Sequence, residues 1–563
     1  LMPQQVHLDG DATGDLPHEL DAMMDWHKGE GQQVFWDEIS GKPLPPNKVK
    51  SARKEEIDFM QSWKVWNEVP TSKCWESTQK PPLDGRWVDV NKGDDQNPDV
   101  RCRWVAKDFA VTKTDEFFAA MPPIEALRML LSFVATGRSN GRGGRKILVM
   151  DAKKAHLHAF PGRDVFVRLP PEIRREGYCA HLQRCLYGTR DAPQRWEAFL
   201  ASELKKHGFQ QGVASACVFV HSTLDLRCVV HGDDFTFAGT DASLKWVEER
   251  MHESFLMKVV GKLGGDAEDA REIRVLNRIL RWTEQGITYE ADPRHVEQLL
   301  RDFPPTGGSV KTAGIKAIEH ESDELLEGTE IRRFRGGAAR INYLAQDRPD
   351  MSYAAKELCR RMHAPCAGDL KAIERVVKYV ASEPRLVYWY VWQQTSALHT
   401  YCDTDFAGCQ VTRKSTSGGC ALLGKHLVKH WASTQKVVTL SSGEAELFGV
   451  VKGATEALGL RSLAQDMGIN DKVDICLYAD SSAAIGICRR TGIGKVRHLA
   501  TGQLWIQEKI RHGDLSLFKV LGTDNPADLF TKHVPRDSAD KYLETMSASR
   551  ETGRADIAPQ LQN

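Results

Sequence analysis

Two adjacent carboxylates, in the triplet Gly232-Asp233-Asp234, interrupt an apolar stretch near the middle of the chain. Residues 228–230 before the triplet and residues 235–238 after it are largely apolar. Apolar runs on either side of a short polar turn predict a β-hairpin. The hairpin would hold two like charges side by side, and such a pair repels itself unless a cation lies close by. An ordinary solvent-exposed turn is the alternative, because Gly and Asp are common turn residues.

A third carboxylate lies well upstream of this hairpin. Asp151 follows the apolar residues 147–150, which read as a buried strand. One Asp at the end of a strand, together with an Asp-Asp hairpin, is a set of ligands able to hold two Mg²⁺ ions for nucleotidyl transfer. Asp151, Asp233 and Asp234 are therefore predicted as metal ligands.

The length and composition of the chain are those of a multi-domain globular protein. Its 563 residues predict several domains, at about 100–200 residues each. A hydrophobic share of 41% with 27% charged residues is ordinary for such a protein. No apolar run approaches the roughly 18 residues that a membrane span needs, so no membrane partner is expected. The 13 cysteines show no zinc-type spacing, which favours reduced thiols inside a cell over a disulfide framework.

The formal net charge is zero, but the charge is unevenly distributed along the chain. Residues 1–40 hold nine acidic residues and a single lysine, Lys28, which is typical of a disordered acidic segment. The remainder of the chain is therefore net basic, and its basic clusters are candidate contacts for a phosphate backbone.

Six further motifs accompany the hairpin in a fixed order. They are Trp63–Pro70, Arg101–Phe109, Met150–His156, Leu186–Trp196, Arg348–Asp350 with Tyr353, and Tyr401–Gly408. Together with the hairpin they resemble the polymerase and RNase H portion of a copia-type LTR retrotransposon Pol polyprotein, over about residues 35–535. The resemblance implies an RNA-directed DNA polymerase with RNase H activity. A catalytically inactive relic that only binds nucleic acid, and a nuclease whose polymerase part is a scaffold, are the alternatives.

The resemblance also implies an α+β fold with palm, fingers and thumb, followed by a helical connection and an α/β RNase H-like domain. The domains expected from it, in chain order, are a disordered segment at 1–45, reverse transcriptase at 46–305, linker and connection at 306–395, RNase H at 396–540 and a polar, frayed tail at 541–563.

The partners that the resemblance implies are an RNA template, a DNA primer, RNA–DNA hybrid and dNTPs. Each active site would use two Mg²⁺, with Mn²⁺ as a substitute. The expected location is a cytoplasmic particle or the nucleus.

In the resembled family Asp151 and Asp233 would be the more direct metal ligands and Asp234 the more peripheral one. The triphosphate also needs positive charge. Arg101, Arg103 and Lys107 are predicted to bind it, because positions i, i+2 and i+6 of a strand share one face. A solvated edge strand is the alternative for these three residues.

Two positions depart from the family pattern. The hairpin reads His231-Gly232-Asp233-Asp234 where the family usually has Tyr-Val-Asp-Asp. His156 stands where the family has an aromatic group that excludes ribonucleotides by its bulk. His156 is therefore a candidate nucleotide-binding residue, with simple packing as the alternative.

Four carboxylates downstream match the order Asp, Glu, Asp, Asp of an RNase H site: Asp403, Glu446, Asp480 and Asp528. The resemblance implies that they hold two Mg²⁺ for hydrolysis of the RNA strand. Asp405 and Glu444 are near neighbours and alternative ligands. Asp403 is favoured because it lies closer to the apolar strand, and Glu446 because Leu447 follows it as the family motif requires. Asp528 is expected to start a last helix.

Overall fold

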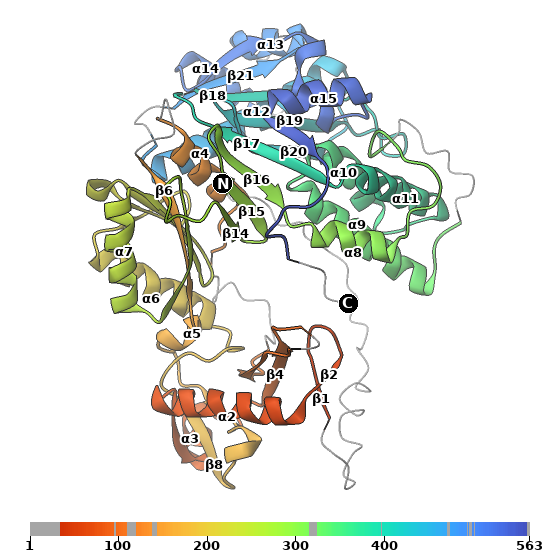
Figure 1. Cartoon of the computed structure of the whole chain (residues 1–563). Helices are drawn as coiled ribbons and strands as arrows, with labels where there is room; N and C mark the ends of the chain where they lie inside the picture. The colour runs from red at the N-terminus through yellow and green to blue at the C-terminus, as the bar shows by residue number, and fades with distance from the viewer. Residues whose placement is uncertain are drawn as a thin grey trace. The chain divides into compact units, whose positions relative to one another are not determined.

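The structure is a computed structural model in which the chain forms two compact units (Figure 1). The N-terminal unit comprises residues 1–111 and 161–190, and the main unit comprises residues 112–160 and 191–563. The residues that the structure describes are 34–94, 97–109, 120–137, 144–314, 324–395, 397–469, 473–492, 494, 498–499 and 501–559.

Helix α2 (Pro46–Ser62) covers a small core in the N-terminal unit. This core gathers Phe35, Leu44, Val49 and Cys102. The strands of the unit are the pair β1 (Phe35–Trp36) and β2 (Pro43–Leu44), the hairpin β4 (Gly85–Asn91) and β5 (Val100–Ala106), and the sheet β3 (Trp66–Pro70), β8 (Tyr178–Leu182) and β7 (Phe166–Val167); the short helix α3 spans Thr71–Thr78.

The β1–β2 pair corrects the expected disordered segment. Residues 35–36 and 43–44 pair as two short strands in which Phe35 and Leu44 are buried, so this part of the expected disordered segment is ordered. The remaining predicted part, residues 1–33, lies outside the described residues.

A six-stranded antiparallel sheet forms the first layer of the main unit, in the order β13-β6-β12-β11-β10-β9. Its strands are β6 (Lys146–Ala152), β9 (Gln210–Gln211), β10 (Val218–His221), β11 (Leu226–His231), β12 (Asp234–Gly239) and β13 (Met257–Leu263). The predicted hairpin is confirmed, because β11 pairs with β12 across a turn at residues 232–233. Helices that belong to this part are α4 (Ile124–Ala135), α5 (Ala155–His158), α6 (Ala192–Lys206) and α7 (Asp241–Ser254).

A second sheet of the main unit joins segments that lie far apart in the sequence. Its order is β14 (Glu272–Val275), β15 (Arg278–Trp282), β16 (Gly286–Ala291), β17 (Arg385–Val391) and β23 (Ala548–Glu551). The last strand corrects the expected frayed tail. The sequence Ala-Ser-Arg-Glu is polar, but backbone pairing with β17 holds it in place, and backbone pairing leaves no hydrophobic signature.

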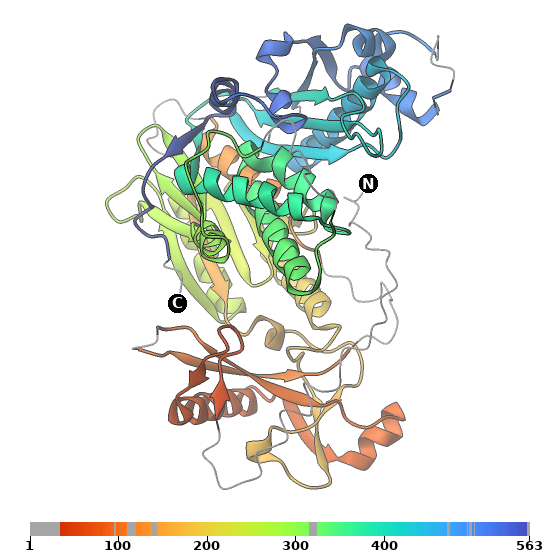
Figure 2. The ribbon, with the colours of Figure 1, turned by 90° about the vertical axis from the view of Figure 1, so that its right-hand side faces the viewer.

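Four helices pack together beside this sheet, as Figure 2 shows for the green and teal segments. They are α8 (Arg294–Asp302), α9 (Gly328–Ala345), α10 (Ser352–Arg361) and α11 (Ala367–Ser382). Phe334, Ile341 and Ile373 form the centre of their common core. The predicted linker lies in part outside the described residues, at 315–323.

Two buried aspartates tie these helices to the sheets. Asp347 accepts ion pairs from Arg128 at 3.0 Å and from Arg278 at 2.9 Å. The Tyr289 hydroxyl donates a hydrogen bond to the same carboxylate at 2.5 Å. Helix α4, strand β15 and the segment after α9 are thereby joined by charge-assisted bonds.

Asp350 has an equivalent set of partners. Arg348 donates to it at 2.8 Å and the Tyr379 hydroxyl at 2.5 Å. Arg550 of β23 in turn donates to the Tyr379 hydroxyl at 3.2 Å. The Arg-Pro-Asp motif is thus part of the buried framework of this region.

The C-terminal part of the main unit is a mixed five-stranded sheet in the order β20-β19-β18-β21-β22. Strands β18 (Ala397–Thr404), β19 (Thr416–Leu423) and β20 (His426–Thr434) are antiparallel, whereas β21 (Asp474–Ala479) and β22 (Ser516–Lys519) run parallel to β18. The helical segments are α12 (Ser442–Asp466), α13 (Ser482–Arg489), α14 (Trp505–Arg511), the 3-10 helix η7 (Pro526–Phe530) and α15 (Arg536–Thr545).

Helix α12 lies very close to strand β18, and glycine permits this approach. A Cβ at Gly449 would lie 2.3 Å from the Thr404 hydroxyl oxygen, and one at Gly453 would lie 3.3 Å from Cys402 Cβ. The helix and strand therefore pack closely where the chain carries its predicted carboxylates.

No helix in the described part of the chain has both the length and the hydropathy of a membrane span.

Candidate active sites

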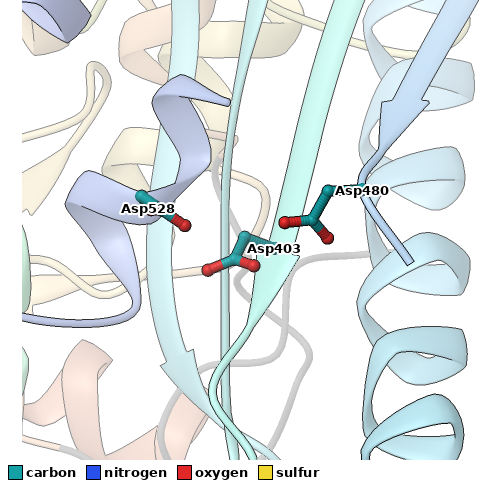
Figure 3. Close-up of side chains that lie close together, drawn as sticks. All are labelled: Asp403, Asp480 and Asp528. Atoms are coloured by element: carbon teal, nitrogen blue, oxygen red, sulfur yellow. The ribbon is translucent and has the colours of Figure 1, made fainter. Parts of the chain in front are cut away.

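Three predicted carboxylates meet at one end of the C-terminal sheet (Figure 3). Asp403 lies on β18, Asp480 directly follows β21, and Asp528 lies in η7. Each offers one oxygen atom, and these atoms lie within 4.8 Å of one another. Because β18 and β21 are parallel, their carboxyl ends reach the same edge of the sheet, which brings Asp403 and Asp480 together.

Asn525 positions the third member of this cluster. Its side chain is fully buried, and its amide nitrogen donates to the Cys402 carbonyl at 3.0 Å. Its oxygen accepts a hydrogen bond from the backbone of Ala527 at 3.2 Å, which starts η7. Asp528 therefore lies inside a 3-10 helix, not at the start of the last α-helix as expected. The next α-helix begins only after Pro535, at α15.

Glu446, on the second turn of α12, is the fourth carboxylate of this region. Its side-chain atom Oε2 is buried without a hydrogen-bond partner among the described residues. Burial raises the pKa of Glu446 to about 9, with further contributions from the charges of Asp403 and Asp480. An acid in this environment is stabilised as the carboxylate only by added positive charge.

The pKa values of two neighbouring carboxylates are raised as well. Burial and the charge of Asp403 raise the pKa of Asp528 to about 7. The same two causes raise the pKa of Asp480. We call Asp403, Glu446, Asp480 and Asp528 the acid cleft. Its donor set is made of carboxylates alone, three of which meet within 4.8 Å, and this is the chemistry that Mg²⁺ prefers, so these residues fit a divalent cation.

The two alternative ligands have partners of their own. Glu444 accepts hydrogen bonds from the Leu440 backbone at 2.9 Å and from His498 Nε2 at 3.0 Å. Asp405 accepts a hydrogen bond from the backbone of Thr416. Neither belongs to the cluster whose oxygens lie within 4.8 Å, whereas Asp403 does.

The hairpin carboxylates of the first sheet are arranged more openly. Asp234 of β12 is the direct cross-strand partner of Asp151 of β6, whereas Asp233 is exposed on the turn. Burial, followed by the charges of Asp233 and Asp151, raises the pKa of Asp234 to about 6. These three residues do not bring one oxygen each within 4.8 Å of one another, in contrast to the acid cleft.

The turn of this hairpin is held from the side by a residue whose role the sequence did not reveal. Trp196 of α6 donates a hydrogen bond from Nε1 to the Gly232 carbonyl at 2.8 Å. Gly232 has a φ of 66°, a conformation that favours glycine. Trp196 is the last residue of the predicted motif Leu186–Trp196. The motif gives no sign that this side chain contacts Gly232, which lies 36 positions further along the chain.

The predicted triphosphate-binding cations lie in the N-terminal unit. Arg101 and Arg103 project from β5, where Arg101 pairs with Asp99 at 3.1 Å and Arg103 lies over the Tyr187 ring at 5.0 Å. Lys107 is outside the strand, because β5 ends at Ala106. The strand therefore presents two of the three predicted cations.

Gly188, in the same motif as Tyr187, explains how this segment reaches β5. It has a φ of 82°, and a Cβ there would lie 2.1 Å from the Ala106 carbonyl oxygen. Only glycine fits so close an approach. His156, the candidate gate residue, lies half-buried on α5 in the main unit.

Three further residues of the acid cleft were missed in the sequence. The Thr531 hydroxyl donates to Asp403 Oδ2, and Lys532 Nζ lies 2.7 Å from Asp528 Oδ1. The Tyr542 hydroxyl donates to Asp528 Oδ2 at 3.4 Å. Lys532 had a detectable signal, because a cation four residues after an acid lies on the same face of a helical turn.

Comparison with known proteins shows what this chain is similar to. Residues 64–265 match the family described as reverse transcriptase (RNA-dependent DNA polymerase). The chain is 26% identical over 523 residues to the retrovirus-related Pol polyprotein from transposon RE1 of Arabidopsis thaliana, covering 90% of this chain and 34% of that protein. It is 23% identical over 514 residues to the Pol polyprotein from transposon TNT 1-94 of Nicotiana tabacum, covering 87% of this chain and 37% of that protein.

The chain thus spans about a third of the length of these relatives. Among solved structures, a foamy viral protease-reverse transcriptase in complex with double-stranded DNA matches 84% of this chain and 70% of its own, with 12% identity and a TM-score of 0.49. The predicted resemblance to Pol polyproteins of copia-type transposons is confirmed over most of the sequence.

Proposed function

We propose, from the premise that this chain carries a reverse-transcriptase domain and resembles copia-type Pol polyproteins over most of its length, that it copies RNA into DNA and degrades the RNA strand of the resulting hybrid. The observation that carries the proposal is the presence of two separate carboxylate sites in one unit of the chain. One lies on the β6–β12 pair and the other at the end of β18 and β21.

At the first site, Asp151 and Asp234 hold fixed positions because they face each other across an antiparallel ladder. Asp233 projects from the turn, and Trp196 restrains that turn through the Gly232 carbonyl. These carboxylates would hold two Mg²⁺, which when bound supply activation of the 3′-hydroxyl and charge compensation of the triphosphate.

The electrostatics of this first site support this role. Asp234 has a pKa of about 6, raised by burial and by its two acidic neighbours, so the site is short of positive charge. Arg101, Arg103 and Lys107 are proposed to supply the positive charge that the triphosphate needs. His156 would limit incorporation of ribonucleotides by its bulk.

The second site is proposed to be an RNase H site. The proposal is supported by a mixed sheet with two parallel strands ending at these carboxylates and a long helix packed against the first strand, since the resemblance implies an α/β domain here. Asp403, Glu446, Asp480 and Asp528 would hold two Mg²⁺, which when bound activate water for phosphodiester hydrolysis. Hybrid would be recognised through its 2′-hydroxyls and phosphates.

The test of this proposal is a pair of assays on one preparation of the full chain: primer extension on an RNA template with dNTPs, and cleavage of an RNA–DNA hybrid. Asp233→Asn should reduce extension by more than about 100-fold, since loss of outer contacts at metal sites alone costs about 10–100-fold. Hybrid cleavage should change less than about twofold, because Asp233 belongs to one site only.

Asp58→Asn is a matched control, because Asp58 is an exposed aspartate of α2 outside both sites. Normal extension by Asp233→Asn would show that the hairpin does not hold the catalytic cation. Parental protein that binds hybrid but performs neither reaction would identify the chain as a nucleic-acid-binding relic. Cleavage without extension would identify it as a nuclease alone.

A further inference from the structure

Lys532 is a cation that lies beside two carboxylates of the acid cleft. Its Nζ lies 2.7 Å from Asp528 Oδ1 and 3.9 Å from Asp403 Oδ2. Among the residues that the structure describes, no other cationic side chain comes within 4 Å of the four cleft carboxylates. The two carboxylates that Lys532 contacts are also two of the three whose oxygens meet within 4.8 Å.

The ammonium group therefore lies beside oxygen atoms that a divalent cation would use as ligands. Asp528 illustrates this well, because its Oδ2 accepts from the Tyr542 hydroxyl at 3.4 Å while its Oδ1 faces Lys532. A neutral hydroxyl can remain beside a metal ligand, whereas a second positive charge at the same oxygen opposes a metal ion by Coulomb repulsion.

The backbone and the side chain of Lys532 differ in their freedom. The backbone nitrogen donates to the Asp528 carbonyl at 3.3 Å, which fixes the residue beside the cleft. The side chain is 52% exposed, and its four-carbon stem carries a compact charge that is readily hydrated. The ammonium can thus leave the carboxylates for solvent without opening the packed core.

Thr531 and Lys532 both contact the Asp403 carboxylate, but in different ways. The Thr531 hydroxyl donates to Oδ2 of that carboxylate and orients it, and the residue is fully buried. Lys532 reaches the same oxygen from a longer distance, 3.9 Å, and from a half-exposed position. One contact is therefore built into the fold, and the other is displaceable.

We propose that Lys532 is a resident cation of the acid cleft, which compensates the carboxylates in the metal-free protein and is displaced by the incoming divalent cation. Lys532 thereby sets the metal concentration at which the cleft fills. The apparent affinity for metal is reduced by the fraction of molecules in which the ammonium occupies the oxygens, as for any competing state. This inference rests on the proposed metal-binding function of the cleft.

The experiment uses Fe²⁺ in place of Mg²⁺ on the full chain, with ascorbate and peroxide, so that bound iron cuts the nearby backbone. Fragments that end near residues 403, 480 and 528 report the acid cleft, and fragments near residues 151 and 233 report the other site as an internal reference. Lys532→Gln should lower the half-saturating Fe²⁺ concentration at the acid cleft by about threefold or more. The half-saturating concentration at the reference site should not change.

Two matched variants separate displacement from a general change of surface charge. Lys541→Gln removes a lysine with the same exposed fraction, 52%, that pairs with Asp524 outside the cleft, and it should leave both sites unchanged. Lys532→Arg keeps the charge and should retain the parental concentration. A role of Lys532 in folding alone would not predict rescue by arginine together with tighter metal binding in the glutamine variant.

A second readout covers the case in which Lys532→Gln is poorly folded. The melting temperature of Lys532→Met, titrated with Mg²⁺, should begin to rise at a lower Mg²⁺ concentration than that of the parental chain. An unchanged or higher half-saturating concentration in both variants would overturn the displacement proposal. Absence of fragments near 403, 480 and 528 in the parental chain would instead overturn the metal site itself.

Discussion

Two groups of acids in the main unit, one with buried side chains and one mostly half-buried, have opposite electrostatic environments. Asp347 and Asp350, in the helical region, are each paired with arginine and with a tyrosine hydroxyl. Burial by itself would raise the pKa of Asp347, but the charges of Arg278 and Arg128 lower it overall. In the acid cleft the pKa of Glu446 is about 9 and that of Asp528 about 7.

The difference lies in where the compensating charge comes from. The arginines that neutralise Asp347 are themselves buried, so charge and counter-charge are both supplied by the fold. In the acid cleft Asp403, Asp480 and Asp528 bring oxygen atoms within 4.8 Å of one another, and the half-exposed Lys532 lies beside Asp403 and Asp528. A buried acid whose counter-charges are themselves buried is neutralised by the fold, whereas carboxylates that share a half-exposed, displaceable lysine can form a site for an external cation.

The largest effect that this comparison predicts is on stability. Asp347→Asn should lower the free energy of unfolding by about 3–5 kcal/mol, because it leaves two buried guanidinium groups without their counter-charge. Denaturant unfolding of the full chain measures this. Asp302→Asn, which breaks a surface pair with Arg340 at 3.6 Å, is the control and should cost less than about 1 kcal/mol. Equal losses of stability in both variants would show that the buried ion pairs of Asp347 matter no more than a surface pair.

The next effect is on activity. Asp480→Asn should reduce hybrid cleavage by more than about 100-fold, since it removes a predicted ligand of the acid cleft. Primer extension should continue, and the melting temperature in chelator should not fall, because one repelling charge is lost. Asp474→Asn, at the exposed start of the same strand β21, is the control. Parental cleavage rates in Asp480→Asn would show that this residue is not a ligand.

The third effect is a dependence of stability on pH. The folded-state pKa of Glu446, about 9, lies above the ordinary glutamate pKa of about 4.3. The folded protein therefore binds this proton more tightly than the unfolded chain, and its stability should fall as the pH rises from about 4.3 towards 9. Metal-free melting temperatures measured across this range give the slope.

Glu446→Gln isolates this contribution, because Asp528 and Asp480 titrate in the same direction in both proteins. The variant should lose part of the slope and melt higher than the parental chain at pH 8. Saturating Mg²⁺ should also reduce the slope of the parental chain. Identical pH profiles for the two proteins would mean that the pKa of Glu446 is not raised by burial and by the neighbouring carboxylates.

Local sequence pattern predicted several elements of this molecule. Apolar runs on either side of Gly232–Asp234 predicted the β11–β12 hairpin, and the apolar residues 147–150 predicted strand β6. The tail was misjudged for an equally local reason. Strand β23 is polar, and its pairing with β17 spans more than 150 residues of sequence.

The choice between neighbouring acids shows the limit of sequence in a different way. Asp403 and Asp405 are two positions apart, so both side chains would lie on the same face of an extended strand. Glu444 and Glu446 lie in one helical segment. Spacing alone therefore could not decide which member of each pair is the ligand. The structure distinguishes them by their partners: Asp405 and Glu444 accept backbone hydrogen bonds, whereas Asp403 joins Asp480 and Asp528.

By itself the sequence determined the kind of protein, because residue identities in ordered motifs carry the resemblance to Pol polyproteins, and it determined which carboxylates were available. Only the tertiary structure decided how each acid is compensated. Arg128 and Arg278 reach Asp347 from 219 and 69 residues away, and Asp403 meets Thr531 from 128 residues away. Electrostatic interactions depend on distance in space and on burial, and neither quantity is set by position along the chain.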